Sequence, residues 1–161
     1  MDKPKCAGQC HCMKWIDIPP VWLGLAAVCV WMVGRVQPMA LRFGGPFTDL
    51  LGGLAVGAGI VLMLLAAVEM RRHRTTIVPH RDADRLVTTG IFGRTRNPIY
   101  LGDLMVLAGL CLRWDAPVGL VLVALLMATL QQRFIIPEED RLRRKFHAEF
   151  ARYCQKTPRW L

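Results

Sequence analysis

Hydrophobic residues along this chain come in long blocks rather than in the periodic patterns of soluble helices and strands. Three stretches, 18–34, 50–68 and 116–132, contain no Asp, Glu, Lys or Arg, and a fourth, 98–112, is interrupted only by Asp103. About 20 apolar residues in a helix cross the hydrocarbon layer of a membrane. The pattern therefore predicts an all-α polytopic membrane protein with about four transmembrane helices. Their expected bounds are about 17–36, 48–69, 98–114 and 116–136.

The segments between the apolar blocks are polar and differ in length. Residues 1–14 are expected to form a flexible cytoplasmic tail, and residues 15–161 a single integral membrane domain. The short connection 115–117 contains Asp, Ala and Pro, which predicts a tight hairpin between the last two spans. In an antiparallel helical pair, the start of the first helix lies beside the end of the second helix. We therefore expect residues 96–100 to lie near residues 133–139.

The segment after the last span predicts an amphipathic helix over 137–154, beginning at a proline that suits a first helical turn or a kink. Leu142, Phe146, Phe150 and Tyr153 recur at spacings of four, four and three, which places them on one apolar face. Such a helix could lie along the membrane surface or cover the loop that precedes the third span.

Lysine and arginine are distributed unevenly between the two ends of the predicted spans. The chain has 161 residues, 53% of them hydrophobic, and a formal net charge of +9. Threading four spans alternately places 18 of the 21 basic residues on one side and three on the other. Because basic loops stay on the cytoplasmic side, the N-terminus, the long middle loop and the C-terminal tail are all predicted to face the cytoplasm. Topology thus explains the basic excess, and no nucleic-acid partner is predicted.

A cluster of thiols near the N-terminus admits three interpretations. Cys6, Cys10, His11 and Cys12 could coordinate zinc, but three adjacent ligands strain a tetrahedral site built from one peptide. Palmitoylation beside the membrane and an unstructured tail are the alternatives. No metal site is assigned to this chain.

Charged and aromatic side chains gather where the last two spans are expected to meet. Arg96 precedes a proline turn, and Tyr100 lies one turn inside the third span. Arg133, Glu138 and Glu139 stand at the exit of the fourth span. On this pattern alone, the arginines reach lipid headgroups and the glutamates cap a helix. Nothing in the sequence has the spacing of a serine-type triad, a histidine metal pair or a phosphate-binding loop.

Two linked motifs at these residues resemble a known family. Residues 86–102 read LVTTGIFGRTRNPIYLG, similar to the isoprenylcysteine carboxyl methyltransferase signature with its Arg-His-Pro-x-Tyr core. The second half of that signature is a Glu-Glu pair with an aromatic tail, here Glu138–Glu139 followed by FHAEFARYCQKTPRW over 146–160. Related phospholipid N-methyltransferases share the pair and add a Gly-x-Gly, which Gly57-Ala-Gly59 resembles, although close helix packing is the simpler interpretation of these glycines. The similarity covers roughly residues 50–161.

The resemblance implies an integral membrane methyltransferase that uses S-adenosylmethionine on the cytoplasmic side. It implies catalytic roles for Arg133 and Glu138. The cofactor-binding residues that it implies are Arg96, Asn97, Pro98, Tyr100, Glu138, Glu139, Gly57 and Gly59. The acceptor would be a lipid or prenyl-like molecule that enters between helices from the membrane.

The nature of the acceptor depends on the arginines. Arg133 corresponds to one arginine that holds a substrate carboxylate in the family, whereas the second, earlier in the chain, has no clear counterpart, and Asn97 replaces the family histidine. An ionised carboxylate needs no general base, and a cationic arginine is a poor neighbour for an amine that must lose a proton. We therefore expect carboxyl O-methylation of the isoprenylcysteine type. Phospholipid amine N-methylation, another small lipophilic acceptor, and a non-catalytic membrane adaptor are the alternatives.

Overall fold

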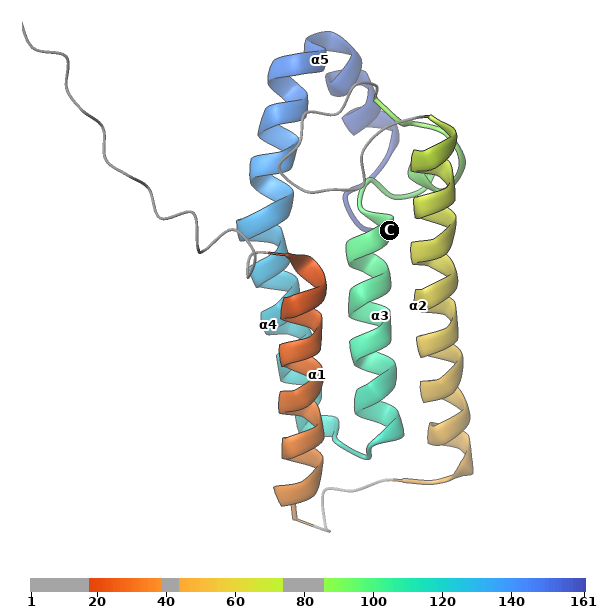
Figure 1. Ribbon diagram of the computed structural model, residues 1–161, viewed down its shortest axis with the longest axis vertical. Helices are drawn as coiled ribbons and strands as arrows, with labels where there is room; N and C mark the ends of the chain where they lie inside the picture. The colour runs from red at the N-terminus through yellow and green to blue at the C-terminus, as the bar shows by residue number, and fades with distance from the viewer. Residues whose placement is uncertain (1–17, 39–43, 74–85) are drawn as a thin grey trace, which may run out of the picture.

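The computed structural model describes residues 18–38, 44–73 and 86–161, and these residues form an all-helical arrangement without strands. The long helices lie side by side (Figure 1). They are α1 (Pro19–Val36), α2 (Pro46–Arg72), α3 (Pro98–Arg113), α4 (Leu120–Leu130) and α5 (Ile136–Lys156). The short elements are the 3-10 turns η3 (Gly90–Gly93) and η4 (Pro117–Gly119) and the π-helical turn η5 (Gln131–Ile135). The predicted all-α class is therefore confirmed for the described residues.

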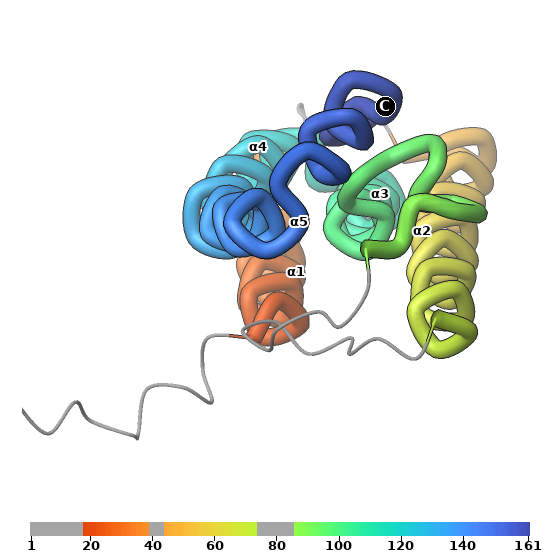
Figure 2. Tube along the Cα trace, turned by 90° about the horizontal axis from the view of Figure 1, so that it is seen from above, coloured from red at the N-terminus to blue at the C-terminus, as the bar shows by residue number. Residues whose placement is uncertain are grey.

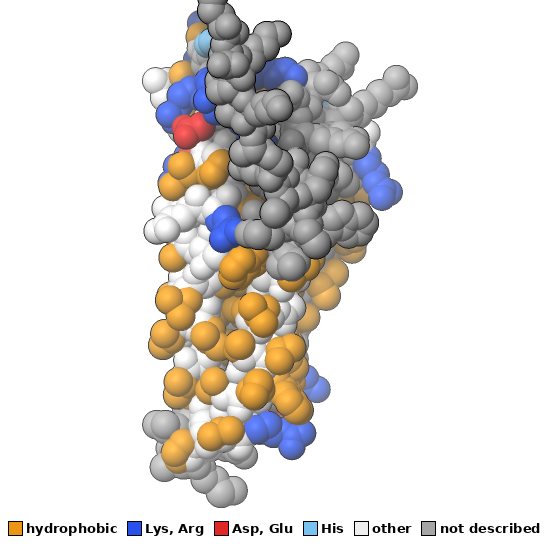
Figure 3. Space-filling model, turned by 60° about the vertical axis from the view of Figure 1, so that its left-hand side comes forward, with side chains coloured by type: hydrophobic (Ala, Val, Ile, Leu, Met, Phe, Trp, Pro, Cys, Tyr) orange, Lys and Arg blue, Asp and Glu red, His pale blue; other side chains and the backbone are white. Residues whose placement is uncertain are grey.

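Three of the described helices are long and apolar enough to cross a membrane. They are Pro19–Val36, Pro46–Arg72 and the helical stretch Pro117–Lys156. Hydrophobic side chains cover the middle of one face of the molecule, and lysines and arginines gather towards its ends (Figure 3). The chain thus has the surface of an integral membrane protein. The third predicted span corresponds to α3, which has 16 residues, so a total of four spans stays a prediction.

Prolines define where three of these helices begin. Pro19, Pro46 and Pro98 occupy the first turns of α1, α2 and α3, where a missing backbone N–H removes no helical hydrogen bond. At α2, the backbone N–H of Gly45 donates to Thr48 Oγ1 at 2.9 Å, and that hydroxyl donates to the Gly45 carbonyl at 2.8 Å. At α3, Pro98 fixes the start of the helix directly after Asn97, in the middle of the predicted site.

Small residues bring α2 and α3 into close contact. A Cβ atom added at Gly52 would lie 2.7 Å from the carbonyl oxygen of Gly109, and one added at Gly59 would lie 2.7 Å from that of Gly102. Only glycine allows two helix backbones to approach so closely. A Cβ at Gly57 would meet nothing within 4 Å. Gly59 thus has a packing role, as the simpler interpretation of the sequence expected, and Gly57 lies away from this contact.

The remaining helices pack on the other side of α3. Seen from above, α3 lies between α2 and α4, and α1 packs against α3 and α4 (Figure 2). The shared core includes Val30 of α1, Leu107 and Cys111 of α3, and Leu130 of α4. The hairpin joining α3 to α4 turns tightly at Asp115, whose φ of 50° lies in the left-handed region. This is the hairpin that the sequence predicts, and it sets α3 and α4 antiparallel.

The last helical stretch differs from the single helix expected over 137–154. The helix runs through the proline at 137, because η5 directly before it is π-helical and such a turn accommodates a missing backbone hydrogen bond. It breaks later, at His147, where φ is 40° and ψ is −112°. The chain reverses there, and the rest of α5 comes back towards the start of α3 (Figure 1). Phe150 and Tyr153 are buried beyond the break, so this part covers the loop before α3.

Candidate functional site

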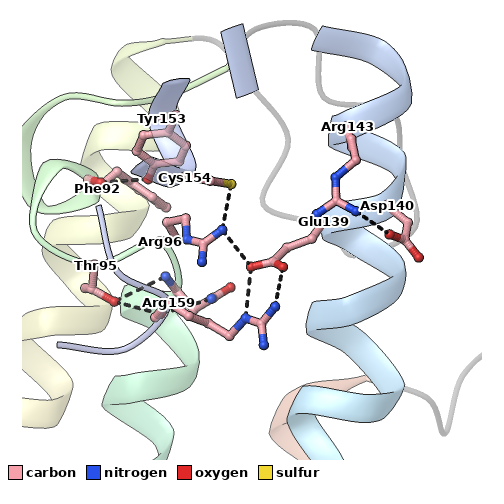
Figure 4. A network of polar contacts seen from close by, with 10 residues as sticks. Phe92, Thr95, Arg96, Glu139, Asp140, Arg143, Tyr153, Cys154 and Arg159 are labelled. Carbon is pink, nitrogen blue, oxygen red and sulfur yellow. Dashed lines mark hydrogen bonds and ion pairs between the residues drawn. The ribbon is translucent and has the colours of Figure 1, made fainter. Parts of the chain in front are cut away.

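The candidate site lies where the start of α3, the first half of α5 and the end of the chain meet (Figure 4). Tyr100 Oη donates to Glu138 Oε2 at 3.3 Å, which joins α3 to α5. Arg96 Nη1 lies 3.2 Å from Glu139 Oε1 in a second bridge between the same segments. The expectation that residues 96–100 lie near the glutamate pair is therefore confirmed, although more than thirty residues separate them in the sequence.

Glu139 is held by two arginines. Arg159 binds its carboxylate in a two-point contact, with Nε 3.1 Å from Oε1 and Nη2 2.6 Å from Oε2. Arg96 shares the same Oε1, and the Glu139 side chain keeps only 8% of its surface exposed. The hydrogen bond with Glu139 raises the pKa of Arg159 above its usual value. A buried carboxylate of this kind is compensated by charge and geometry within the protein itself.

Residues 157–161, called here the C-terminal strap, lie across the turn that begins α3. The backbone N–H of Arg96 donates to the Pro158 carbonyl at 3.0 Å. Thr95 Oγ1 and Asn97 Nδ2 both donate to the Arg159 carbonyl, at 3.2 and 3.1 Å. The Trp160 side chain packs against the shared helical core. The strap and the Glu139 ion pairs together fix the shape of the turn around Asn97.

Further bonds tie the second half of α5 and the first residue of the strap to the loop that contains η3. Tyr153 Oη donates to the Phe92 carbonyl at 2.7 Å, and Thr157 Oγ1 donates to the Gly93 carbonyl at 3.4 Å. Arg96 Nη1 also donates to Cys154 Sγ at 2.7 Å. These contacts explain why the helix must break, since only the reversed chain brings these side chains onto the loop.

Glu138 has different partners from its neighbour. Tyr100 Oη is a hydrogen-bond donor to its carboxylate. Arg141, one turn further along α5, acts on it electrostatically. The Tyr100 ring packs at a tilt of 31° against Phe134, with ring centroids 6.4 Å apart. Glu138 thus places a carboxylate beside the Tyr100 ring, whereas Glu139 is held by two arginines.

The opposite edge of the loop is anchored to the end of α2. Thr89 Oγ1 donates to Glu69 Oε1 at 2.5 Å, and His73 Nε2 lies 2.8 Å from the same hydroxyl. Gly90 has a φ of 59°, and a Cβ there would lie 2.8 Å from the Glu69 carboxyl carbon. A residue with a side chain would displace this anchor. The loop before α3 is therefore held at both edges, by α2 and by the strap.

Several residues predicted for the site lie outside this cluster. Arg133 lies in η5, with its guanidinium carbon 5.4 Å from the centre of the Trp22 ring on α1. Gly57 and Gly59 lie on α2, where Gly59 contacts α3. The roles of these three residues in binding stay predictions. The thiol cluster near the N-terminus falls outside the described residues.

Arg159 was missed by the sequence reasoning, which sought a second arginine earlier in the chain. It lies twenty positions beyond Glu139, beyond the broken helix, so no helical periodicity connects the two residues. The one sequence signal was its place next to Pro158 in the aromatic tail motif. Only the reversal at His147 brings it to the carboxylate.

The fold and the cluster together define an integral membrane protein with a polar site at one end of its helices. The family model for phospholipid methyltransferases matches residues 47–149, and the chain therefore belongs to the phospholipid methyltransferase family. It is a membrane methyltransferase. The matched region includes the turn before α3 and both glutamates and ends before the strap. Comparison with curated proteins and with solved structures gives no match.

Proposed function

We propose that this protein transfers a methyl group from S-adenosylmethionine to a lipophilic acceptor at the site between α3 and α5. The observation that carries the proposal is the contrast between the two glutamates. Glu139 is neutralised by Arg96 and Arg159, whereas Glu138 accepts a hydrogen bond from the neutral Tyr100 hydroxyl. A carboxylate so placed at a membrane protein's polar end favours a cationic ligand.

The residues around Glu138 fit the groups that S-adenosylmethionine carries. Its ammonium or its ribose hydroxyls would be held by Glu138, and its adenosine would lie against Asn97, Pro98 and the Tyr100 ring. Arg96 has a buried Nε without a hydrogen-bond partner among residues 18–38, 44–73 and 86–161, and this N–H could donate to an acceptor atom of the ligand. Glu139 would act indirectly, by fixing Arg96 and the strap.

The chain's own part in the reaction would be positioning and electrostatics. The cofactor supplies an electrophilic methyl group: the acceptor atom bonds to the methyl carbon as the carbon–sulfur bond breaks, and the electron pair stays on sulfur. Glu138 and Tyr100 would fix the orientation of that group, and the strap would exclude water. Correct orientation alone accounts for a large share of such rate enhancements. An ionised carboxylate acceptor would require no proton transfer.

Two classes of acceptor follow from different observations. A carboxylate of the isoprenylcysteine type suits Arg133, whose guanidinium lies over Trp22 in the contact between α1 and the last helix, where a lipophilic molecule could enter from the membrane. A phospholipid amine suits the family to which the chain belongs. We place carboxyl methylation first because of Arg133. Transfer of labelled methyl groups to a prenylated cysteine carboxylate, compared with phosphatidylethanolamine vesicles, decides between the two.

The proposal includes a single catalytic domain over 15–161 with its site on the cytoplasmic side. Calorimetric titration of the purified protein in detergent with S-adenosylmethionine tests it. Glu138→Gln should weaken binding roughly ten- to hundred-fold, because a charge-assisted hydrogen bond contributes about 1.5–3 kcal/mol. Glu149→Gln is the matched control, since Glu149 is exposed on the same helix. A parent protein that does not bind would support the adaptor alternative, and equal binding by both variants would remove Glu138 from the site.

A further inference from the structure

Asp103 is a carboxylic acid inside α3 that the proposed site does not use. Its residue surface is only 3% exposed, and its Oδ2 is buried without a hydrogen-bond partner in the part of the chain that the structure describes. Its neighbours Leu104 and Leu107 belong to the apolar core. Burying an acidic oxygen without a partner is costly, and acids within membrane helices usually serve a ligand or an ion.

The position of Asp103 connects it to the candidate site. It follows Tyr100 by three residues on the same helix, so the two side chains are neighbours on the α3 surface. Tyr100 is the residue that donates to Glu138. Glu138, Tyr100 and Asp103 therefore form a line that leads from the end of the bundle into the apolar part of α3.

Two other acids, Asp49 and Glu139, have cationic partners. Asp49 lies 3.6 Å from Arg113, and Glu139 is held by two arginines. A structural role for Asp103 would predict a comparable partner, such as a hydroxyl, an amide or a guanidinium. Its buried Oδ2 has none among the described residues. A ligand with a positive charge would supply the missing partner.

We propose that Asp103 forms an anionic subsite for an organic cation, one helical turn beneath Tyr100. This rests on the proposed methyl transfer. Sulfonium and alkylammonium groups have the required chemistry, because both are organic cations whose charge a buried carboxylate compensates. The cation comes either from the cofactor, as its sulfonium or its ammonium, or from an amine acceptor. Asp103 thereby positions a charged end of one reactant next to the site.

The test compares Asp103→Asn with the parent and with Asp49→Asn, which removes the same charge near the opposite end of the bundle. Calorimetry in detergent measures the dissociation constants of S-adenosylmethionine and of S-adenosylhomocysteine, which lacks the sulfonium. Methyl transfer to phosphatidylethanolamine vesicles measures KM for an amine. Asparagine has nearly the same shape and no charge, so the unfolding temperature without ligand should stay the same or rise.

Each source of the cation gives a different result for Asp103→Asn. If Asp103 contacts the sulfonium, the variant binds S-adenosylmethionine about tenfold more weakly or worse, and its affinity for S-adenosylhomocysteine is unchanged. Contact with the cofactor's ammonium weakens both ligands by a similar factor. An amine acceptor raises KM about tenfold and leaves both affinities unchanged. The subsite is overturned if none of these changes occurs, or if Asp49→Asn reproduces them. If the parent binds no cofactor and methylates no amine, the proposed function is wrong and the subsite falls with it. If the parent does bind the cofactor or methylate the amine and Asp103→Asn behaves as the parent does, only the subsite is wrong.

Discussion

The ion pair between Glu139 and Arg159 can be tested by a double-mutant cycle. Glu139→Gln removes one charge and keeps the side-chain length, Arg159→Gln removes one charge and shortens the side chain, and the double variant removes both charges. If the two side chains act on each other as their distances of 2.6 and 3.1 Å indicate, the contact between them is lost and the strap loosens in all three variants. The double variant should then lose much less stability than the two single variants lose together.

The expected size of the coupling follows from burial. Two charge-assisted hydrogen bonds of about 1.5–3 kcal/mol each would set an upper bound, were the pair fully enclosed. The Arg159 side chain keeps 33% of its surface exposed, so water screens part of this interaction. Arg96 also remains beside the carboxylate in the Arg159 variant and retains part of the stabilisation. We therefore expect a coupling free energy of about 1–3 kcal/mol.

Chemical unfolding in detergent micelles measures this coupling, and hydrogen exchange of peptides that contain residues 157–161 locates it. All three variants should speed exchange in the strap and in the turn that it covers. Arg144→Gln is the matched control, because Arg144 is exposed on α5 and carries the same charge. A coupling free energy below about 0.5 kcal/mol, or strap exchange as slow as in the parent, would refute the reasoning.

Three further predictions concern packing, acceptor binding and topology. Gly59→Ala should lower the unfolding temperature in detergent because its Cβ would meet the α3 backbone at 2.7 Å, whereas Gly57→Ala, with nothing within 4 Å, should not; equal effects would contradict the packing. Arg133→Ala should sharply lower turnover and leave S-adenosylmethionine affinity nearly unchanged, and lysine should restore activity only partly because it lacks the planar two-point contact. Full activity of Arg133→Lys would instead indicate that the cation at this position only contacts lipid headgroups. Reporter fusions after Leu161 should lie in the cytoplasm and an insertion at Gly45 outside, and a cytoplasmic signal at Gly45 would overturn the four-span topology.

The sequence by itself determined the all-helical class and the proximity of residues 96–100 to the glutamate pair. Charge-free blocks as long as a bilayer is thick leave few choices other than membrane helices, because burying so much apolar surface requires lipid. The short hairpin at 115–117 sets α3 against α4 through chain connectivity alone. Local rules therefore sufficed to bring Tyr100 to Glu138 and Arg96 to Glu139, as the distances confirm.

The tertiary structure alone decided which partners these residues contact. Periodicity cannot predict that a helix reverses at His147, because the positive φ there is maintained by contacts made afterwards, such as Tyr153 with the Phe92 carbonyl. That reversal brings Arg159 into contact with Glu139. Glu139 is therefore held by two arginines, whereas Glu138 beside it accepts a hydrogen bond from Tyr100. Likewise, Asp103 reads in the sequence as one acid in an apolar stretch. That its Oδ2 is buried without a partner among the described residues is a property of the packed helices, because burial and hydrogen bonding depend on residues distant in the chain.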